Sequence, residues 1–284
     1  MQRQLHYQNN IATLYLIPTP IGNLEDITFR AINIMKSVDV LYAEDTRVSS
    51  KLLCHYEINK PLKSYHEHNK RLQTEEIISA LEMGQHIGLM SDAGMPLFND
   101  PGYEIAQAAM EKGYNVVCLP GANAAITGLL MSGIQPTPFL FFGFLDSKKL
   151  KRIEELESLK YHEETLVFYE TPHRIEEMIQ DIYQVFGDRV VSIIREISKT
   201  FEEVIKGKVS ELSLLQGLKG EMVVVVEGYV SKVEYDTNIS LVEQVDYFIA
   251  SGLSKTEAMK KVSQMTRIPK NKIYQDYLEK KLKK

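Results

Sequence analysis

The sequence predicts an α/β protein with two α/β domains followed by a small helical appendage. Through the first 130 residues, short apolar runs alternate with segments whose apolar residues have helical spacing. A break crowded with Gly133, Pro136 and Pro138 follows, and the alternation resumes after it. Beyond a polar linker near residue 231, only helical spacing remains. We therefore expect domains at residues 11–134 and 135–231 and a basic helical appendage at residues 232–284.

The first expected domain has the pattern of a mostly parallel sheet covered by helices. Apolar runs predict strands at residues 14–18, 38–43, 87–90 and 115–119. A helix is expected to start near Phe29, capped by Asp26 or Thr28. Further helices are expected at residues 75–83, 103–112 and 122–131. Sheets of this kind bind ligands at the edge formed by the carboxyl ends of their strands.

The second expected domain also mixes strands and helices. Strands are predicted at residues 139–144, 165–169, 190–195 and 220–227, and helices at residues 148–159 and 174–186. In the appendage, helices are predicted at about residues 240–251, 255–266 and 270–283, the last after a break at Pro269.

Composition indicates a cytoplasmic globular protein. The chain is 44% apolar and 25% charged, and its apolar runs are far shorter than the ~20 residues that a bilayer requires. The first ten residues have no apolar core of a signal peptide. The two cysteines, Cys54 and Cys118, form no CxxC pair, which argues against a disulfide framework or a zinc–thiolate site.

Charge is unevenly distributed along the chain. Residues 251–284 hold ten basic and three acidic residues, a net +7, whereas the rest holds 23 basic and 35 acidic residues, a net −12. Such a tail is expected to contact a polyanion. A solvated helical tail without such a partner is the alternative.

Three loops rich in small residues follow predicted strands. They contain Pro18-Thr19-Pro20-Ile21-Gly22-Asn23, Ser91-Asp92-Ala93-Gly94-Met95-Pro96 and Leu119-Pro120-Gly121-Ala122-Asn123. Neither GxG nor a Walker A pattern occurs, so the Rossmann fingerprint and the Walker A phosphate-binding loop are excluded. Small residues allow a planar ligand to approach backbone groups closely. The loops predict a ligand site at one sheet edge, and three ordinary turns are the alternative.

At these loops the sequence resembles the ribosomal RNA small-subunit methyltransferase I family, of the tetrapyrrole methylase superfamily. The motifs that carry the resemblance, in order, are LYLIPTPIGNLEDITFRA, AEDTR, SYHEHN, SDAGMP with NDPG, LPGANAA, FYETPHR, REISKTFEE and KGEMVVVVEG. They cover roughly residues 13–228. Three positions depart from the usual pattern: Met95, Ala122 and Asp146. The first two lie in loops expected to touch the cofactor.

The resemblance implies a fold, a cofactor and a reaction. It implies two α/β domains of the tetrapyrrole-methylase type with S-adenosylmethionine in the cleft between them, and a homodimer. It implies 2′-O-methylation of a cytidine ribose in the decoding region of 16S ribosomal RNA in the small (30S) subunit. A tetrapyrrole precursor methylase and a non-catalytic ribosome-assembly RNA-binding protein are the alternatives.

The resemblance and the loops together give candidate residues. Those expected to bind the cofactor are Pro20, Ser91, Asp92, Ala93, Gly94, Pro120, Gly121, Ala124, Ala125, Tyr169, Glu221 and Met222. The candidate bases, which would deprotonate the ribose hydroxyl, are Asp45, Asp100 and Glu170. Those expected to contact RNA are Arg47, His66, His68, Asn69, Lys148, Lys149, Arg152, His173, Arg174 and Lys199. His66 and His68 lack further spaced ligands, so no metal site is predicted.

The appendage is expected to be a separately mobile unit that docks on RNA. Ala258, Val262 and Met265 are followed, after the break at Pro269, by Ile273, Tyr274, Tyr277 and Leu278, all at helical spacing. Its lysines would then face outward. The alternative is a helical tail packed for stability alone.

Overall fold

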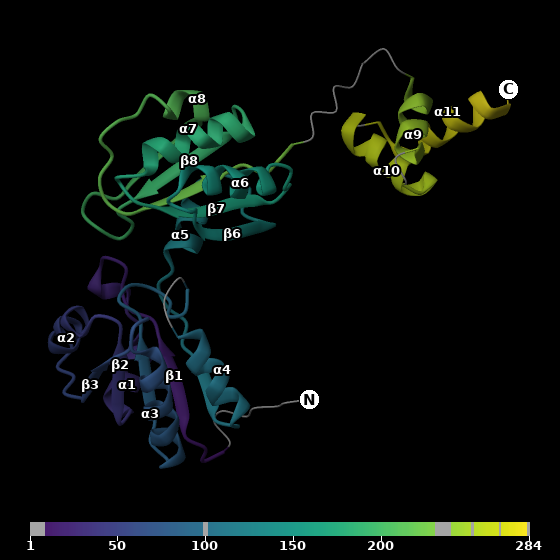
Figure 1. Ribbon diagram of the computed structural model, residues 1–284. Coiled ribbons are helices and arrows are strands. Elements are labelled where there is room, and N and C mark those ends of the chain that lie inside the picture. Colours follow the sequence, from purple (N-terminus) through teal and green to yellow (C-terminus); the bar gives the residue numbers. More distant parts are fainter. Residues whose placement is uncertain (1–8, 99–101, 231–239, 251–252, 267, 283–284) are drawn as a thin grey trace. The chain divides into compact units, whose positions relative to one another are not determined.

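The computed structural model describes residues 9–98, 102–230, 240–250, 253–266 and 268–282 (Figure 1). The chain forms two compact units, one ending at Tyr229 and the other starting at Val230. The first unit contains two five-stranded sheets. The expected division at residue 134 stays a prediction. Among the described residues, no helix has the length and apolar character needed to cross a membrane.

The first sheet is entirely parallel, as the alternation predicts. Its strand order is β3-β2-β4-β1-β5, and every neighbouring pair runs in the same direction. Its strands are β1 (Thr13–Ile17), β2 (Val40–Ala43), β3 (Leu62–Ser64), β4 (Ile87–Met90) and β5 (Asn115–Cys118). Because β4, β1 and β5 are adjacent and parallel, the loops that follow them leave from one edge of the sheet.

Helices connect and cover these strands. They are α1 (Phe29–Ser37), α2 (Thr46–His55), α3 (Lys70–Glu82) and α4 (Tyr103–Glu111), with a short 3-10 turn η1 (Leu24–Asp26) before α1. Thr28 caps α1, since its hydroxyl oxygen accepts from the backbone N–H of Ala31 at 3.1 Å. Asp26 lies in η1 instead. The sequence analysis missed both α2 and β3.

The second sheet is mixed. Its order is β6-β7-β10-β8-β9, and among these neighbours only β6 and β7 run parallel. Its strands are β6 (Phe139–Phe144), β7 (Thr165–Glu170), β8 (Val190–Arg195), β9 (Glu203–Lys208) and β10 (Met222–Val226). The helices that pack on one face are α6 (Lys149–Leu159), α7 (Ile175–Phe186) and the short α8 (Val209–Leu212). The sequence analysis missed β9 and α8.

The helix α5 (Ala124–Met131) follows the first sheet in sequence but packs on the other face of the second sheet. Its Ala125 and Leu129 join Val223 and Val225 of β10 in one apolar cluster. The approach is close at Gly128, where a Cβ would lie 2.9 Å from the Cβ of Val223. Helix α5 therefore fastens the loop after β5 to the second sheet.

The C-terminal unit contains three helices, as predicted, and these helices share a core of their own. Its helices are α9 (Leu241–Ala250), α10 (Lys255–Thr266) and α11 (Lys270–Leu282). Val245, Val262, Ile273 and Tyr277 are buried in that core. Of the expected apolar face, Met265, Tyr274 and Leu278 are exposed.

Candidate functional site

The loops after β1 and β4 are joined into one rigid wall. Thr19 and Gly94 exchange two backbone hydrogen bonds, each 3.0 Å long. The hydroxyl of Thr19 also donates to the backbone oxygen of Ser91 at 3.1 Å. Gly94 has φ +80°, and a Cβ there would lie 3.1 Å from the side chain of Ile21. Glycine at this position therefore allows the two loops to approach each other.

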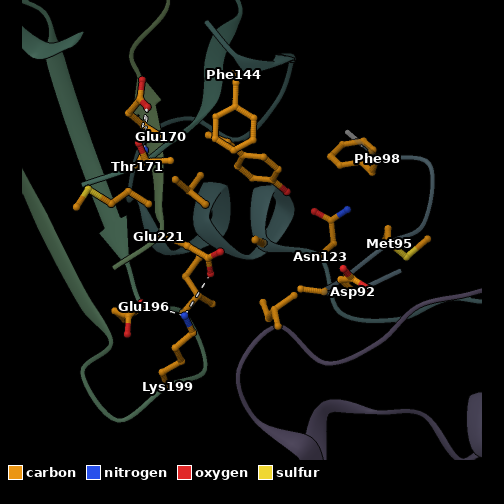
Figure 2. A pocket seen from close by; sticks show the side chains of 18 residues that line it. Asp92, Met95, Phe98, Asn123, Phe144, Glu170, Thr171, Glu196, Lys199 and Glu221 are labelled. Atoms are coloured by element: carbon orange, nitrogen blue, oxygen red, sulfur yellow. Dashed lines mark hydrogen bonds and ion pairs between the residues drawn. The ribbon is translucent and has the colours of Figure 1, made fainter. Parts of the chain in front are cut away.

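Beside this wall, a cavity of about 280 Å³ lies between the two sheets; we call it the inter-sheet cavity (Figure 2). The loops after β1 and β4 and the start of α5 line it from one side. The ends of β6 and β7, the loop after β8 and the start of β10 line it from the other. Predicted cofactor residues that line it are Asp92, Ala93, Gly94, Ala124, Tyr169, Glu221 and Met222.

Five predicted cofactor residues lie outside this lining. Pro20 and Ser91 line a second cavity instead. Pro120 and Gly121 are exposed, and Ala125 is buried with its N–H donating to the Tyr169 hydroxyl at 3.2 Å. The lining residues that the sequence analysis did not assign to the cofactor are Ile21, Met95, Phe98, Asn123, Phe144, Glu170, Thr171, Glu196, Ile197, Lys199 and Val223. Most are apolar or belong to the second sheet, whose strand ends carry no small-residue signature.

Glu170 is a buried carboxylate in the cavity wall. Its Oε1 accepts from the backbone N–H of Thr171 at 2.8 Å and lies 3.4 Å from Nε of Arg174. Its Oε2 is buried without a hydrogen-bond partner among the described residues. Burial raises the pKa of Glu170, and the neighbouring donors only partly offset this effect. In the sheet, Glu170 pairs directly with Met222 of β10.

Asp92 and Asp45 are joined across neighbouring strand ends. The Asp92 Oδ1 accepts from the backbone N–H of Asp45 at 3.1 Å, and burial raises the pKa of Asp92. Asp45 caps α2, and Arg47 donates to both of its carboxylate oxygens. The hydrogen bond from the Arg47 side chain is the main cause that lowers the pKa of Asp45 to about 2. Asp100, the third candidate base, lies outside the described residues.

Lys199, which was expected to contact RNA, lies in the cavity wall. Its Nζ is 2.9 Å from the Glu196 Oε1 and 3.2 Å from the Glu221 Oε2 (Figure 2). Two residues of this loop have left-handed backbone, Glu196 with φ 53° and Ser198 with φ 65°. Non-glycine residues in that region are strained, and such strain gathers at functional sites.

Comparison with known proteins identifies the family. The family of Tetrapyrrole (Corrin/Porphyrin) Methylases matches residues 13–213. A protein of Bacillus subtilis (strain 168) named "Ribosomal RNA small subunit methyltransferase I" is 45% identical, with 98% of each chain covered. A protein of the same name from Halalkalibacterium halodurans is 44% identical over 98% of this chain and 99% of that protein. The chain belongs to the ribosomal RNA small subunit methyltransferase I family.

Solved structures confirm the tetrapyrrole-methylase fold. The uroporphyrin-III-C-methyltransferase of Thermus thermophilus aligns with a TM-score of 0.56 at 19% identity, over 76% of this chain and 94% of that one. A diphthine synthase aligns with a TM-score of 0.57 at 15% identity, over 76% and 90%. At these identities the likeness concerns the fold alone.

Family membership makes the two loop departures informative. Met95 lines the inter-sheet cavity. The backbone oxygen of Ala122 lies 3.5 Å from the position that a Cβ of Gly94 would occupy. Both residues are therefore part of the loop packing around the cavity.

The structure corrects the prediction that Arg152 contacts RNA. Arg152 is 1% exposed and its guanidinium donates to Asp181 at 2.7 Å and to Glu177 at 2.9 Å. The buried guanidinium joins α6 to α7 through these two carboxylates and is unavailable to phosphate.

The other residues expected at RNA differ in exposure. Arg47, His68, Lys148, Lys149 and His173 are exposed. Arg174 is half-buried and donates to the backbone oxygens of Leu145 and Asp146 at 2.6 and 3.2 Å. Asn69 holds the turn after β3, accepting from the N–H of His66 at 2.8 Å and donating to the Ser64 oxygen at 3.1 Å. Within the described ranges no cluster of His, Cys, Asp and Glu could hold a metal ion.

Proposed function

We propose that this protein methylates small-subunit ribosomal RNA with S-adenosylmethionine, and that the acceptor is the 2′-hydroxyl of a cytidine ribose in the decoding region. The observation that carries the proposal is the inter-sheet cavity, lined by the small-residue loops of the first sheet and by strand ends of the second. The relatives named for ribosomal RNA methylation, matched over nearly their whole length, favour this substrate over a tetrapyrrole precursor.

The residues of the cavity fit the cofactor. Ala93, Gly94 and Ala124 leave backbone groups open to a planar ligand, and Tyr169 and Met222 add apolar surface. The unpartnered Oε2 of Glu170 is an acceptor that a ligand amine or hydroxyl would satisfy. When bound, S-adenosylmethionine supplies an electrophilic methyl group. The protein must orient the acceptor hydroxyl, exclude water and take up a proton.

We assign the two described candidate bases to different ends of the site. Glu170 pairs in the sheet with Met222, which the family resemblance assigns to the cofactor, so we assign Glu170 to the cofactor side. The backbone N–H of Asp45 donates to Asp92, and Asp45 caps the start of α2, so we assign Asp45 to the acceptor side. Arg47 is 87% exposed and can exchange the Asp45 carboxylate for an RNA phosphate. That exchange would remove the main cause of the lowered pKa of Asp45 and make it a stronger base.

The partner we propose is the small ribosomal subunit, bound by a homodimer in the cytoplasm. The exposed Lys148, Lys149 and His173 and the basic C-terminal unit would meet its phosphates. We also propose the domain boundaries predicted from the sequence, at residues 11–134, 135–231 and 232–284.

The test is transfer of a labelled methyl group from S-adenosylmethionine to small subunits isolated from a strain that lacks this gene. Nuclease digestion followed by mass spectrometry should find one 2′-O-methylcytidine gained in the decoding region. Calorimetry should find one cofactor site per chain. A protein that binds S-adenosylmethionine but methylates a corrin precursor, and not the subunit, would contradict the proposal.

A further inference from the structure

A second cavity of about 420 Å³ lies next to the inter-sheet cavity; we call it the α2 cavity. One wall is α2, and the other is formed by the loops after β1 and β4. Leu24 and Val48 at its border are 41% and 47% exposed, so it opens to solvent. Its volume lies in the range of small-molecule sites.

The two cavities share the wall that joins Thr19 to Gly94. Along the loop after β1, Pro20 and Gly22 line the α2 cavity whereas Ile21 between them lines the inter-sheet cavity. The chain bends at Ile21 and Gly22, so this one loop contributes residues to both cavities. Asp92 lines both cavities. A ligand in one cavity is therefore separated from a ligand in the other by one loop and one carboxylate.

The α2 cavity has an apolar part and a cationic border. Pro20, Leu24 and Leu52 form apolar surface of a kind that packs on a flat ring. Lys51 and His55 are exposed and lie four residues apart, on one face of α2. The Tyr56 hydroxyl donates to the backbone oxygen of Leu24 and holds η1 against the end of α2. This hydrogen bond holds two parts of the cavity wall together, so the α2 cavity is not an incidental gap between loops.

The side chain of Ser49 is independent evidence that the α2 cavity binds a ligand. It lines the α2 cavity, is 2% exposed, and its Oγ is buried with no hydrogen-bond partner among the described residues. Buried polar atoms are nearly always satisfied, so an unpaired one at a cavity points to a ligand that completes it. A serine hydroxyl reorients by rotation about one bond and can either donate or accept.

We propose that the α2 cavity binds the acceptor nucleoside of the RNA strand, splayed out of its stack. This inference rests on the proposed function and adds to it the site of the substrate. The base packs on Pro20, Leu24 and Leu52, and the Ser49 hydroxyl bonds to its polar edge. Lys51 and His55 meet the flanking phosphates. The ribose then lies against Asp92, on the side from which the inter-sheet cavity is reached.

Two substitutions on α2 test the proposal. Ser49→Ala removes the hydroxyl, and Val48→Trp places a bulky ring at the exposed border of the cavity. The matched control is Ser50→Ala on the same helix, since Ser50 is exposed and its hydroxyl donates to the Arg47 oxygen at 3.1 Å. The assay is methyl transfer to small subunits that lack the modification, with KM for the subunit, kcat, the Kd for S-adenosylmethionine and the Tm measured for each variant.

We expect Ser49→Ala to lower kcat/KM for the subunit roughly 3–10-fold, the worth of one hydrogen bond, and Val48→Trp to lower it more. The Kd for S-adenosylmethionine should stay within about twofold of wild type, as hydrogen bonds to the cofactor are untouched. The Tm of Ser49→Ala should not fall, because the free protein loses only an unsatisfied group. Ser50→Ala should behave as wild type.

Every other outcome contradicts a specific part of the proposal. If wild type methylates the subunit and both α2 variants keep its kcat/KM, the nucleoside binds elsewhere while the proposed function stands. A raised Kd for S-adenosylmethionine in both variants would make the α2 cavity an extension of the cofactor site. An equal loss in Ser50→Ala would indicate a general effect on the helix. If wild type binds the cofactor and leaves the subunit unmethylated, the proposed function itself fails, and this inference with it.

Discussion

Replacing Arg152 by methionine should destabilise the protein without weakening its binding to RNA. The guanidinium is 1% exposed and donates to Asp181 at 2.7 Å and Glu177 at 2.9 Å, and Asp181 is itself 3% exposed. Removing the cation leaves the Asp181 carboxylate buried and without its main partner. Breaking a buried pair in this way costs about 3–5 kcal/mol. For a unit of this size, that cost corresponds to a fall in Tm of roughly 6–20 °C.

Lys149→Met is the matched control, because it removes a cation from the same carboxylate. The Lys149 Nζ lies 3.7 Å from the Asp181 Oδ1, but its side chain is 68% exposed. An exposed pair is worth at most about 1 kcal/mol, so its Tm should fall by no more than roughly 4 °C. The double variant Arg152→Met with Asp181→Leu should regain much of the loss. Tm is measured by circular dichroism, and affinity for the small subunit by filter binding. An Arg152→Met protein with the Tm of the control and a weakened, less salt-dependent affinity would refute the structural role.

Four further predictions concern the site and the C-terminal unit. Asp92→Ala should weaken S-adenosylmethionine binding without unfolding the chain, and an unchanged affinity by calorimetry would remove Asp92 from the cofactor site. Asp45→Asn keeps the cap of α2, since asparagine caps as well as aspartate; turnover should fall by about 10²–10⁴, and a change of less than about threefold would exclude a base role. Glu170→Gln should raise the Kd for the cofactor more than it lowers kcat. The substitution should also raise the Tm at pH 7. Burial raises the pKa of Glu170 in the folded protein above the ordinary 4.5, so the wild type loses stability as the pH rises from 4.5 through the folded pKa. Below pH 4.5 the wild-type carboxyl is protonated, and the Tm difference between variant and wild type should vanish. Deleting residues 230–284 should leave cofactor affinity intact, weaken subunit binding and flatten its salt dependence; unchanged affinity and slope would make the unit structural.

Most of the fold could be predicted from the spacing of apolar residues. The bounds of β4, β6 and β8 agree with the predicted strands, because each is a compact run of mostly apolar residues. Helix α2 was missed because it begins inside the charged run at residues 44–47, where the capping role of Asp45 is hidden by the salt-bridge pattern. Strand β9 was missed because its residues, EVIKGK, are mostly exposed at the edge of the sheet and carry little apolar signal.

The site could be predicted on one side only. The small residues after the predicted strands indicate that these loops lie together, because the carboxyl ends of adjacent parallel strands are at one edge of the sheet. The opposite wall comes from strand ends such as Glu170 and Glu221, and only the family resemblance indicates these. For charged residues such as Lys199 and Arg152, the sequence does not indicate where the side chain lies in the fold. A cation in a basic motif has the same sequence signal whether it faces solvent, lines a cavity or is paired in the interior.

Helix α2, one of the elements that the sequence analysis missed, is the one on which the proposed acceptor site depends. Strand-end reasoning finds sites made by loops, and it found the residues after β1, β4 and β5. The α2 cavity instead needs one face of a helix, with Ser49 and Leu52, set against the loop that contains Pro20. These segments meet because β2, from which α2 emerges, lies beside β4, and β4 lies beside β1, the strand before the Pro20 loop. That same adjacency bonds Asp45 to Asp92 and so places the start of α2 beside the carboxylate shared by both cavities. Strand order, which local spacing does not encode, therefore decides where donor and acceptor can meet.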